Sequence, residues 1–311
     1  MTALETDYSD TRSTNADWAF QRYNAIRHRL PTAKFPLSAT QVTDLAELED
    51  TFDAFIFDSF GVLNVGETPI PIAASRISAL RAAGKHVLVL TNAATGPLAD
   101  LTEKYSRLGF DFTAEEIVSS RDVLAQALKL YQPGKIWGVV APDISRIEEL
   151  PINCVRLAPG QPINPSIEGL ILLSSQEIDK EFASAIEAHL ADHPMPVLVG
   201  NPDLVAPRET GFSLEPGSYA HDLADRLGIV PVFFGKPYGN AFAAARACLP
   251  DTIAPGRIAM VGDTLHTDIL GGAAAGLGTV LVTEHGVMKD MDAAGCITTS
   301  GIVPNYVAPH I

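Results

Sequence analysis

Short apolar runs alternate with amphipathic segments along most of the chain. Residues 54–57 (AFIF) and 87–90 (VLVL) have the pattern of buried strands, and residues 72–83 between them have helical spacing. The alternation continues through residues 98–108, 117–118 and 121–131. Strands that alternate with helices of about ten residues are typical of βαβ units and a parallel sheet. The pattern therefore predicts a doubly wound α/β fold.

A second alternating set begins after the break Gln132-Pro133-Gly134. Its expected elements are strands at residues 136–140, 170–173 and 197–200 and a helix at residues 179–192. The first style resumes with expected strands at residues 232–234, 257–261 and 279–282. We therefore expect a parallel core, residues 51–133 and 232–311, that is interrupted by an inserted α/β unit, residues 134–231.

The first fifty residues differ from the rest of the chain. Thr14 or Asn15 is a candidate N-cap for a helix through residues 17–23, and Pro31 would end that helix. We expect residues 1–50 to form a helical extension. Two roles are possible for this extension. It could be an arm that contacts a partner, for example a second copy of the chain in a homo-oligomer. It could instead be a helix packed on its own domain, which we favour.

Composition and charge narrow the class of protein. The chain has 311 residues, of which 47% are hydrophobic and 19% charged, as in globular proteins. The net charge of −15 disfavours nucleic-acid binding. Three irregularly spaced cysteines disfavour a disulfide framework or a zinc site, and neither a signal peptide nor an apolar run of about 18 residues is visible. We expect a soluble, cytoplasmic protein without membrane contact.

Polar side chains follow the expected core strands at the points where the strands end. In open parallel sheets, the functional side chains gather at this carboxyl edge of the sheet. The residues in these positions are Asp58, Thr91, Asn92, Lys236 and Asp263, with Asp268 five residues after Asp263.

These residue types fit together chemically. Asp58, Asp263 and Asp268 form a hard oxygen cluster of the kind that holds Mg²⁺, and adjacent carboxylates would repel each other without a cation. Lys236 and the Thr91 hydroxyl can bind phosphate oxygens. Asp58 can act as a nucleophile, because carboxylates form phospho-aspartyl intermediates.

Four segments resemble the motifs of the haloacid dehalogenase (HAD) superfamily. They are FDSFGVL (57–63), VLTNAA (89–94), FFGKPYGNAF (233–242) and MVGDTLHTDILGG (260–272). The order of the motifs and the inserted segment resemble the class IIA branch of sugar- and aryl-phosphatases. Gly200-Asn201-Pro202-Asp203 is similar to a segment that class IIA members carry late in the insert. The resemblance covers about residue 51 to the C-terminus.

The resemblance implies roles for the strand-end residues. Asp58 is then the nucleophile and a Mg²⁺ ligand, and Asp263 and Asp268 complete the metal site, Asp268 directly or through water. Thr91 and Asn92 hold the phosphoryl group of a small phosphorylated substrate. Lys236 neutralises the nucleophile and the phosphate. The insert is then a mobile cap that closes over the site.

Phe60 departs from the family pattern. The family usually has an Asp at this position, which acts as general acid and base and offers Mg²⁺ a backbone carbonyl. Phe60 keeps the carbonyl but cannot move a proton, and general acid–base help is worth roughly 10²–10⁴-fold. We therefore expect a weak phosphatase that favours aryl or acyl phosphates.

Two alternatives to a metal-dependent phosphatase remain open. A non-catalytic protein that binds a phosphorylated ligand ranks second, and a metal-free haloacid dehalogenase, whose family members carry Tyr at this position, ranks third. His266 and His285 lie close enough in sequence to the motifs to supply a proton, although a structural role is the simpler interpretation for both.

Overall fold

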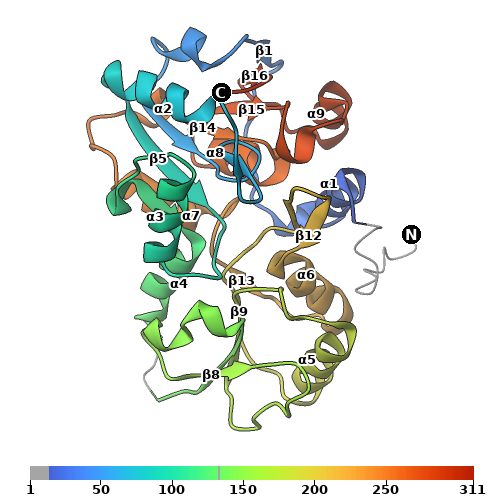
Figure 1. Cartoon of the computed structure of the whole chain (residues 1–311). Coiled ribbons are helices and arrows are strands. Elements are labelled where there is room, and N and C mark those ends of the chain that lie inside the picture. Colours follow the sequence, from blue (N-terminus) through green and yellow to red (C-terminus); the bar gives the residue numbers. More distant parts are fainter. Residues whose placement is uncertain (1–13, 132–133) are drawn as a thin grey trace.

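The larger lobe is built on a seven-stranded sheet in which neighbouring strands run parallel (Figure 1). The computed structural model describes residues 14–131 and 134–311, so the segment before residue 14 and most of the expected break at 132–134 lie outside it. The strands are, in spatial order, β1 (Thr40–Gln41), β16 (Tyr306–Ala308), β15 (Gly278–Val282), β14 (Ile258–Gly262), β2 (Ala54–Phe57), β5 (His86–Thr91) and β6 (Ile117–Ser119). The predicted doubly wound fold is confirmed.

Strands β2 and β14 lie side by side at the centre of this sheet. The chain leaves β2 toward β5 and β6 on one side, and leaves β14 toward β15 and β16 on the other. Such a reversal of strand order opens a crevice at the carboxyl ends of the two strands. All side chains of β2 and β14 are buried, as expected for strands that are covered on both faces.

Helices cover both faces of the seven-stranded sheet. Helices α2 and α3 pack with Phe55 and Phe57 on one face, while α4 and α7 pack with Ile56 and Met260 on the other. The helices of this lobe are α2 (Ala73–Ala82), α3 (Leu98–Arg107), α4 (Ser120–Leu128), α7 (Gly239–Ala247), α8 (Leu270–Ala274) and α9 (Ala293–Ser300). A small hairpin, β3 (Asn64–Val65) with β4 (Thr68–Pro69), follows the first motif.

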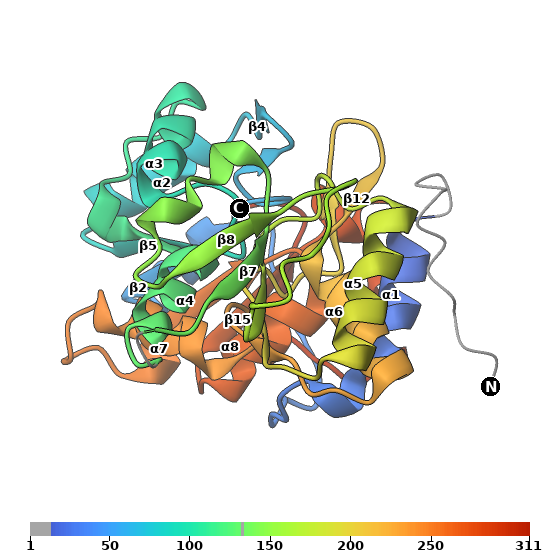
Figure 2. The ribbon, with the colours of Figure 1, turned by 90° about the horizontal axis from the view of Figure 1, so that it is seen from below.

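The insert forms the smaller lobe around a five-stranded parallel sheet (Figure 2). Its strands are, in spatial order, β13 (Val232–Phe233), β10 (Val197–Val199), β9 (Gly169–Leu172), β7 (Trp137–Val140) and β8 (Cys154–Leu157). Its helices are α5 (Lys180–Asp192) and α6 (Pro216–Leu227), and it carries an antiparallel hairpin of β11 (Val205–Pro207) and β12 (Phe212–Leu214).

One expected strand belongs to the other lobe. Residues 232–234 were expected to resume the core, but β13 pairs with β10, with Leu198 opposite Val232, at the edge of the smaller sheet. Phe233 packs into the apolar core of the insert. An apolar run predicts a strand but not its neighbour, which explains why the pattern misplaced this one.

The N-terminal extension contacts both lobes. Its helix α1 (Ala16–Ala25) is capped by Asn15, whose side chain accepts a hydrogen bond from the Trp18 amide at 2.8 Å. The helix ends earlier than predicted, at Ala25, and a 3₁₀ turn over Arg27–Arg29 leads to Pro31. The extension is not wholly helical, because β1 joins the edge of the larger sheet beside β16.

Polar contacts join α1 to both lobes, so it packs on its own chain, but not on its own domain alone as the favoured interpretation had it. Arg22 forms a buried ion pair with Asp222 (2.9 Å) and a second, partly exposed one with Asp225 (2.6 Å) of α6. The Tyr23 hydroxyl accepts a hydrogen bond from the Leu204 amide of the insert at 3.1 Å. On its other side, the Tyr23 ring stacks on His266 of the larger lobe, with 5.1 Å between ring centroids.

Candidate active site

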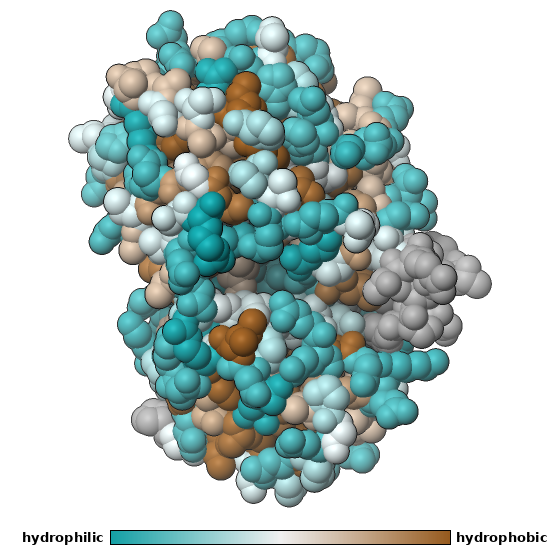
Figure 3. Space-filling model, viewed as in Figure 1, coloured by the Kyte–Doolittle hydropathy of each residue, from teal (hydrophilic) through white to brown (hydrophobic). Residues whose placement is uncertain are grey.

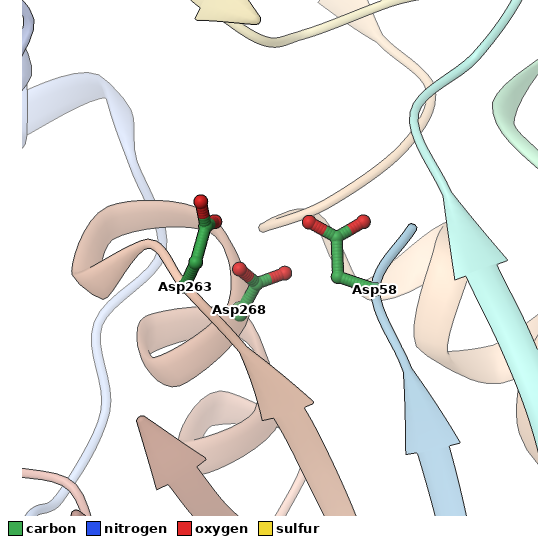
Figure 4. A group of neighbouring side chains, drawn as sticks. All are labelled: Asp58, Asp263 and Asp268. Carbon is green, nitrogen blue, oxygen red and sulfur yellow. The ribbon is translucent and has the colours of Figure 1, made fainter. Parts of the chain in front are cut away.

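Three carboxylates from the larger lobe meet where β2 and β14 end (Figure 4). Asp58 follows β2, Asp263 follows β14, and Asp268 lies in the turn of helix after β14. One oxygen of each carboxylate lies within 4.8 Å of one oxygen of the other two. The structure thus brings together the three acids that the sequence placed at strand ends.

Asp58 is held by the sheet and by a buried lysine. Its amide donates to the Val261 carbonyl at 2.9 Å, so the ladder between β2 and β14 extends to the residue itself. Its carboxylate accepts from the Ser59 amide at 2.7 Å and pairs with the Lys236 ammonium at 2.5 Å. The Lys236 side chain is 1% exposed and also pairs with Asp268 at 2.8 Å.

Lys236 reaches the site from a segment that differs from the expected one. It was predicted to follow a strand of the core, but it follows β13 of the smaller sheet, in the stretch that leads back to α7. The polar group still arrives at the same edge because this stretch runs past the ends of the central strands.

A π-helical turn places Asp268. Residues Leu265–Ile269 form this turn, and the Asp268 carboxylate folds back to accept a hydrogen bond from the Thr264 amide at 3.1 Å. A Cβ at Gly262 would lie 2.1 Å from the Asp268 carboxyl carbon, so only glycine allows this approach. Single π-helical turns are often found at functional sites.

Asp263 is fixed by two donors. Its carboxylate accepts from the Val287 amide at 2.7 Å and from the Thr264 hydroxyl at 2.8 Å. Gly61 has a φ of +78° and presses against this carboxylate, at a point where a Cβ would lie 2.1 Å from Oδ2. The turn that carries Phe60 therefore packs directly on the acid cluster.

The cluster carries more negative charge than its lysine offsets. Burial, followed by repulsion from Asp58 and Asp268, raises the pKa of Asp263 well above its ordinary value. Burial and Asp58 raise the pKa of Asp268 to about 6, although Lys236 opposes this shift. Burial alone would lower the pKa of Lys236, but its carboxylate neighbours raise it. Three oxygen donors with excess negative charge fit a hard divalent cation such as Mg²⁺.

Asn92 connects the lysine to the insert. Its Oδ1 accepts from the Lys236 amide (2.7 Å) and the Ser120 hydroxyl (2.9 Å). Its Nδ2 donates to the Lys236 carbonyl (3.0 Å) and to an Asp203 oxygen (2.8 Å). The Asn92 amide thus positions Lys236, and contact with a phosphoryl group stays a prediction. Thr91 is buried at the end of β5, where its hydroxyl accepts from the Ala93 amide at 3.2 Å.

Asp203 is a site residue to which the sequence analysis gave no role. It lies in the Gly200-Asn201-Pro202-Asp203 turn of the insert and borders the same cavity as Asp58. Burial and, more weakly, Asp58 raise its pKa well above the ordinary value, although Lys236 acts in the opposite direction. The resemblance of this turn to class IIA members was the signal that could have identified it.

A cavity of about 290 Å³ lies over these residues, between the two lobes. Hydrophilic side chains line the junction of the lobes at the surface (Figure 3). The cavity is bordered by the larger lobe, the insert and α1; its walls include Tyr23, Asp58, Phe60, Lys104, Asp203 and Arg208. The volume suits a small substrate.

The candidate proton donors from the sequence lie elsewhere. Neither His266 nor His285 is among the described residues that border the cavity. The His266 Nε2 lies 2.9 Å from Asn24 Oδ1, and burial, together with Arg27, lowers the His266 pKa to about 3. His266 therefore stays neutral near pH 7 and serves to anchor α1.

Among the residues that the structure describes, no helix is long and apolar enough to cross a membrane.

Comparisons with known proteins agree with this geometry. Residues 55–149 match the model of the haloacid dehalogenase-like hydrolases, and residues 233–311 match a second, HAD-hydrolase-like model. Rat chronophin is 30% identical over 82% of this chain and 84% of its own length. Human glycerol-3-phosphate phosphatase is 29% identical over 83% of this chain and 88% of its own length. A possible sugar phosphatase of the HAD superfamily from Cytophaga hutchinsonii has a TM-score of 0.77 at 28% identity and covers 88% of this chain and 98% of its own.

Proposed function

The chain belongs to the haloacid dehalogenase-like hydrolase family, and we propose that it hydrolyses small phosphomonoesters with Mg²⁺ through a phospho-aspartyl intermediate on Asp58. The observation that carries the proposal is the close grouping of Asp58, Asp263 and Asp268 beside the cavity, three carboxylates that share the single lysine Lys236. Relatives of this chain that are named as phosphatases support the reaction class.

The first step transfers the phosphoryl group to Asp58. One carboxylate oxygen attacks phosphorus, and the bond from phosphorus to the leaving oxygen breaks. Lys236, which pairs with Asp58 and Asp268, offsets part of the charge that gathers between them. Thr91, at the end of the neighbouring strand β5, would contact the phosphoryl oxygens.

The metal site would be formed by Asp58, Asp263 and Asp268, with the Phe60 carbonyl as a further ligand. A bound Mg²⁺ would supply positive charge that stabilises the negative charge of the phosphoryl oxygens. Thr264 and Val287 hold the Asp263 carboxylate in place, so the protein keeps its acids oriented.

The second step releases phosphate. Water attacks the phospho-aspartyl group, both of its protons leave with the phosphate as H₂PO₄⁻, and Asp58 is regenerated as a carboxylate. The Phe60 side chain has no proton to exchange in either step. We therefore expect slow turnover and a preference for leaving groups that are stable as anions, namely phenolates and carboxylates.

The test is an assay of the purified protein with 4-nitrophenyl phosphate, an acyl phosphate and a panel of phosphorylated metabolites, with Mg²⁺ and with EDTA. We expect hydrolysis that requires Mg²⁺ and that Asp58→Asn abolishes. Asp53→Asn, which alters an exposed ion pair with Arg257, is the matched control and should retain activity.

The two alternatives are outcomes of the same test. Binding of phosphorylated compounds without turnover would indicate a ligand-binding protein. Release of chloride from a 2-chloro acid in the presence of EDTA would indicate a dehalogenase. Either result would contradict the proposed phosphatase.

A further inference from the structure

Two cations flank the Phe60 ring at the wall of the cavity. The Lys104 ammonium lies 4.5 Å from the ring centroid, and the Arg208 guanidinium carbon lies 5.2 Å from it. Both side chains border the same cavity as Asp58. A cation at such distances is attracted by the negative face of the ring, which holds its position.

The two cations come from different lobes. Lys104 belongs to α3 of the larger lobe, and Arg208 follows β11 in the hairpin of the insert. Phe60, two residues after Asp58, is therefore a surface shared by both lobes. The pair is complete only when the insert sits over the core as it does in this structure.

Each cation is held by a carboxylate and keeps further donors. Lys104 pairs with Glu67 at 2.9 Å and lies 3.4 Å from the Gly66 carbonyl, and an ammonium has a third N–H bond. Arg208 uses Nε toward the Ser213 hydroxyl (2.8 Å) and Nη2 toward Glu215 (3.0 Å), and a guanidinium has five N–H bonds. The two side chains are thus fixed in place with donor capacity to spare.

We infer that Lys104 and Arg208 are catalytic residues that bind the leaving-group oxygen and stabilise its negative charge, in place of a proton donor. This inference rests on the proposed function. It assigns the substrate class as phosphates whose leaving group departs as an oxyanion, phenyl and acyl phosphates before alkyl phosphates.

The bond changes balance without a proton. As the Asp58 oxygen bonds to phosphorus, the electron pair of the breaking bond stays on the leaving oxygen. That oxygen departs as RO⁻ or RCOO⁻ and is met by the ammonium and the guanidinium. Fixed cations in a partly desolvated cavity stabilise such developing charge more than water does.

The test is the dependence of kcat/KM on leaving-group pKa across substituted phenyl phosphates, because kcat/KM reports on the first step whichever later step limits turnover. Lys104→Met and Arg208→Met should each lower kcat/KM for the poorest leaving group by about 10²-fold or more, and clearly less for 4-nitrophenyl phosphate, so that the dependence steepens. Lys104→Arg should retain most of the activity. Phe60→Leu, which keeps an apolar side chain but removes the ring face, should steepen the dependence in the same direction.

The matched control is Arg81→Met. Arg81 also lies over a phenylalanine ring, that of Phe112, at 5.2 Å, but it does not border the cavity. For Arg81→Met, the dependence of kcat/KM on leaving-group pKa should equal that of the unaltered protein. Thermal unfolding should show that each variant is folded. An equal loss for every leaving group would assign the pair to substrate binding and overturn the inference. If the unaltered protein hydrolyses none of the esters, the proposed function fails and the inference with it.

Discussion

The two cations beside Phe60 determine how a carboxylic acid would behave if it replaced Phe60. An Asp there would lie beside Lys104 and Arg208, and two adjacent cations favour the ionised form of a carboxyl group. We expect Phe60→Asp alone to raise activity on alkyl phosphates by far less than the roughly 10²-fold that a general acid can supply. The factor by which Phe60→Asp raises kcat/KM on an alkyl phosphate should be larger in a Lys104→Met background, compared with Lys104→Met alone, than in the unaltered protein. A full gain from the single substitution would show that the cations do not control the acid.

Asp263 gives a test of the metal site that needs no turnover. Asn can keep both contacts of this side chain, by accepting from the Val287 amide and donating to the Thr264 hydroxyl oxygen. Because the substitution removes one of three clustered carboxylates, two of which are buried, we expect Asp263→Asn to be more stable than the unaltered protein in EDTA.

Added Mg²⁺ should reverse this order. A ligand at one hundred times its Kd stabilises a protein by about 2.7 kcal/mol, and the unaltered protein should gain an amount of this size that Asp263→Asn does not. Urea unfolding with Mg²⁺ and with EDTA measures both effects. Equal stabilisation of the two proteins by Mg²⁺ would contradict the proposed site.

Residues at strand ends could be predicted from the sequence, while residues that meet only through tertiary structure could not. The rule that working groups follow parallel strands placed Asp58 and Asp263 correctly at one edge. Lys104 sits within a helix and Arg208 within a hairpin of the insert, and only the packing of the two lobes brings them together at Phe60. Their charges alone predict exposed surface residues.

Among the elements, α1 and α6 form a contact that should respond to acid. His221 of α6 is 1% exposed and stacks on Phe233, with 4.7 Å between ring centroids. Burial, followed by the charges of Arg29 and Arg22 from the N-terminal segment, lowers its pKa to about 3. Protonation of His221 would place a third positive charge near Arg22 and Arg29, which would destabilise the contact between α1 and α6.

The sign of the pH effect follows from this lowered pKa. Because folding favours neutral His221, its contribution to stability is complete above the unfolded pKa of about 6.5 and declines as the pH falls toward the folded value of about 3. The loss at pH 5 should be about 2 kcal/mol. Urea unfolding at pH 7 and pH 5 should show a smaller difference for His221→Gln than for the unaltered protein. His193→Gln, at an exposed position of the same lobe, should not change the difference. If the difference in unfolding free energy between pH 7 and pH 5 is the same for all three proteins, the assignment to His221 is refuted.

The sequence predicted most elements of both lobes, but it did not predict every strand or every strand pairing. Apolar patterns identified the central strands because β2 and β14 are buried along their whole length and β5 is buried at every residue after His86. The pattern missed β8, whose side chains are mostly half-buried at the edge of the smaller sheet, because the apolar signal weakens there. It also missed β1, which is two exposed residues long and forms only because β16 is beside it.

At the scale of the whole molecule, the two lobes and α1 together line the cavity of the candidate site. The cavity wall takes Tyr23 from the extension, Asp58 from the larger lobe and Asp203 from the insert. Periodicity along the chain predicts each lobe by itself but says nothing of how they face each other. The sequence therefore could not predict that the three parts share one site.

The pairing of β2 with β14 also dictates an order of assembly. Ala54 lies opposite Ile258, so this central ladder closes a loop of about 200 residues, which for a flexible chain costs about 5 kcal/mol in entropy. The smaller sheet, by contrast, uses one continuous stretch from Trp137 to Phe233. We expect pulsed hydrogen exchange during refolding to protect amides of β7, β9 and β10 before those of β2 and β14; simultaneous protection would refute this. During synthesis on the ribosome, the insert would then fold first. Its folding shortens the loop between β2 and β14 before β14 emerges to complete the core.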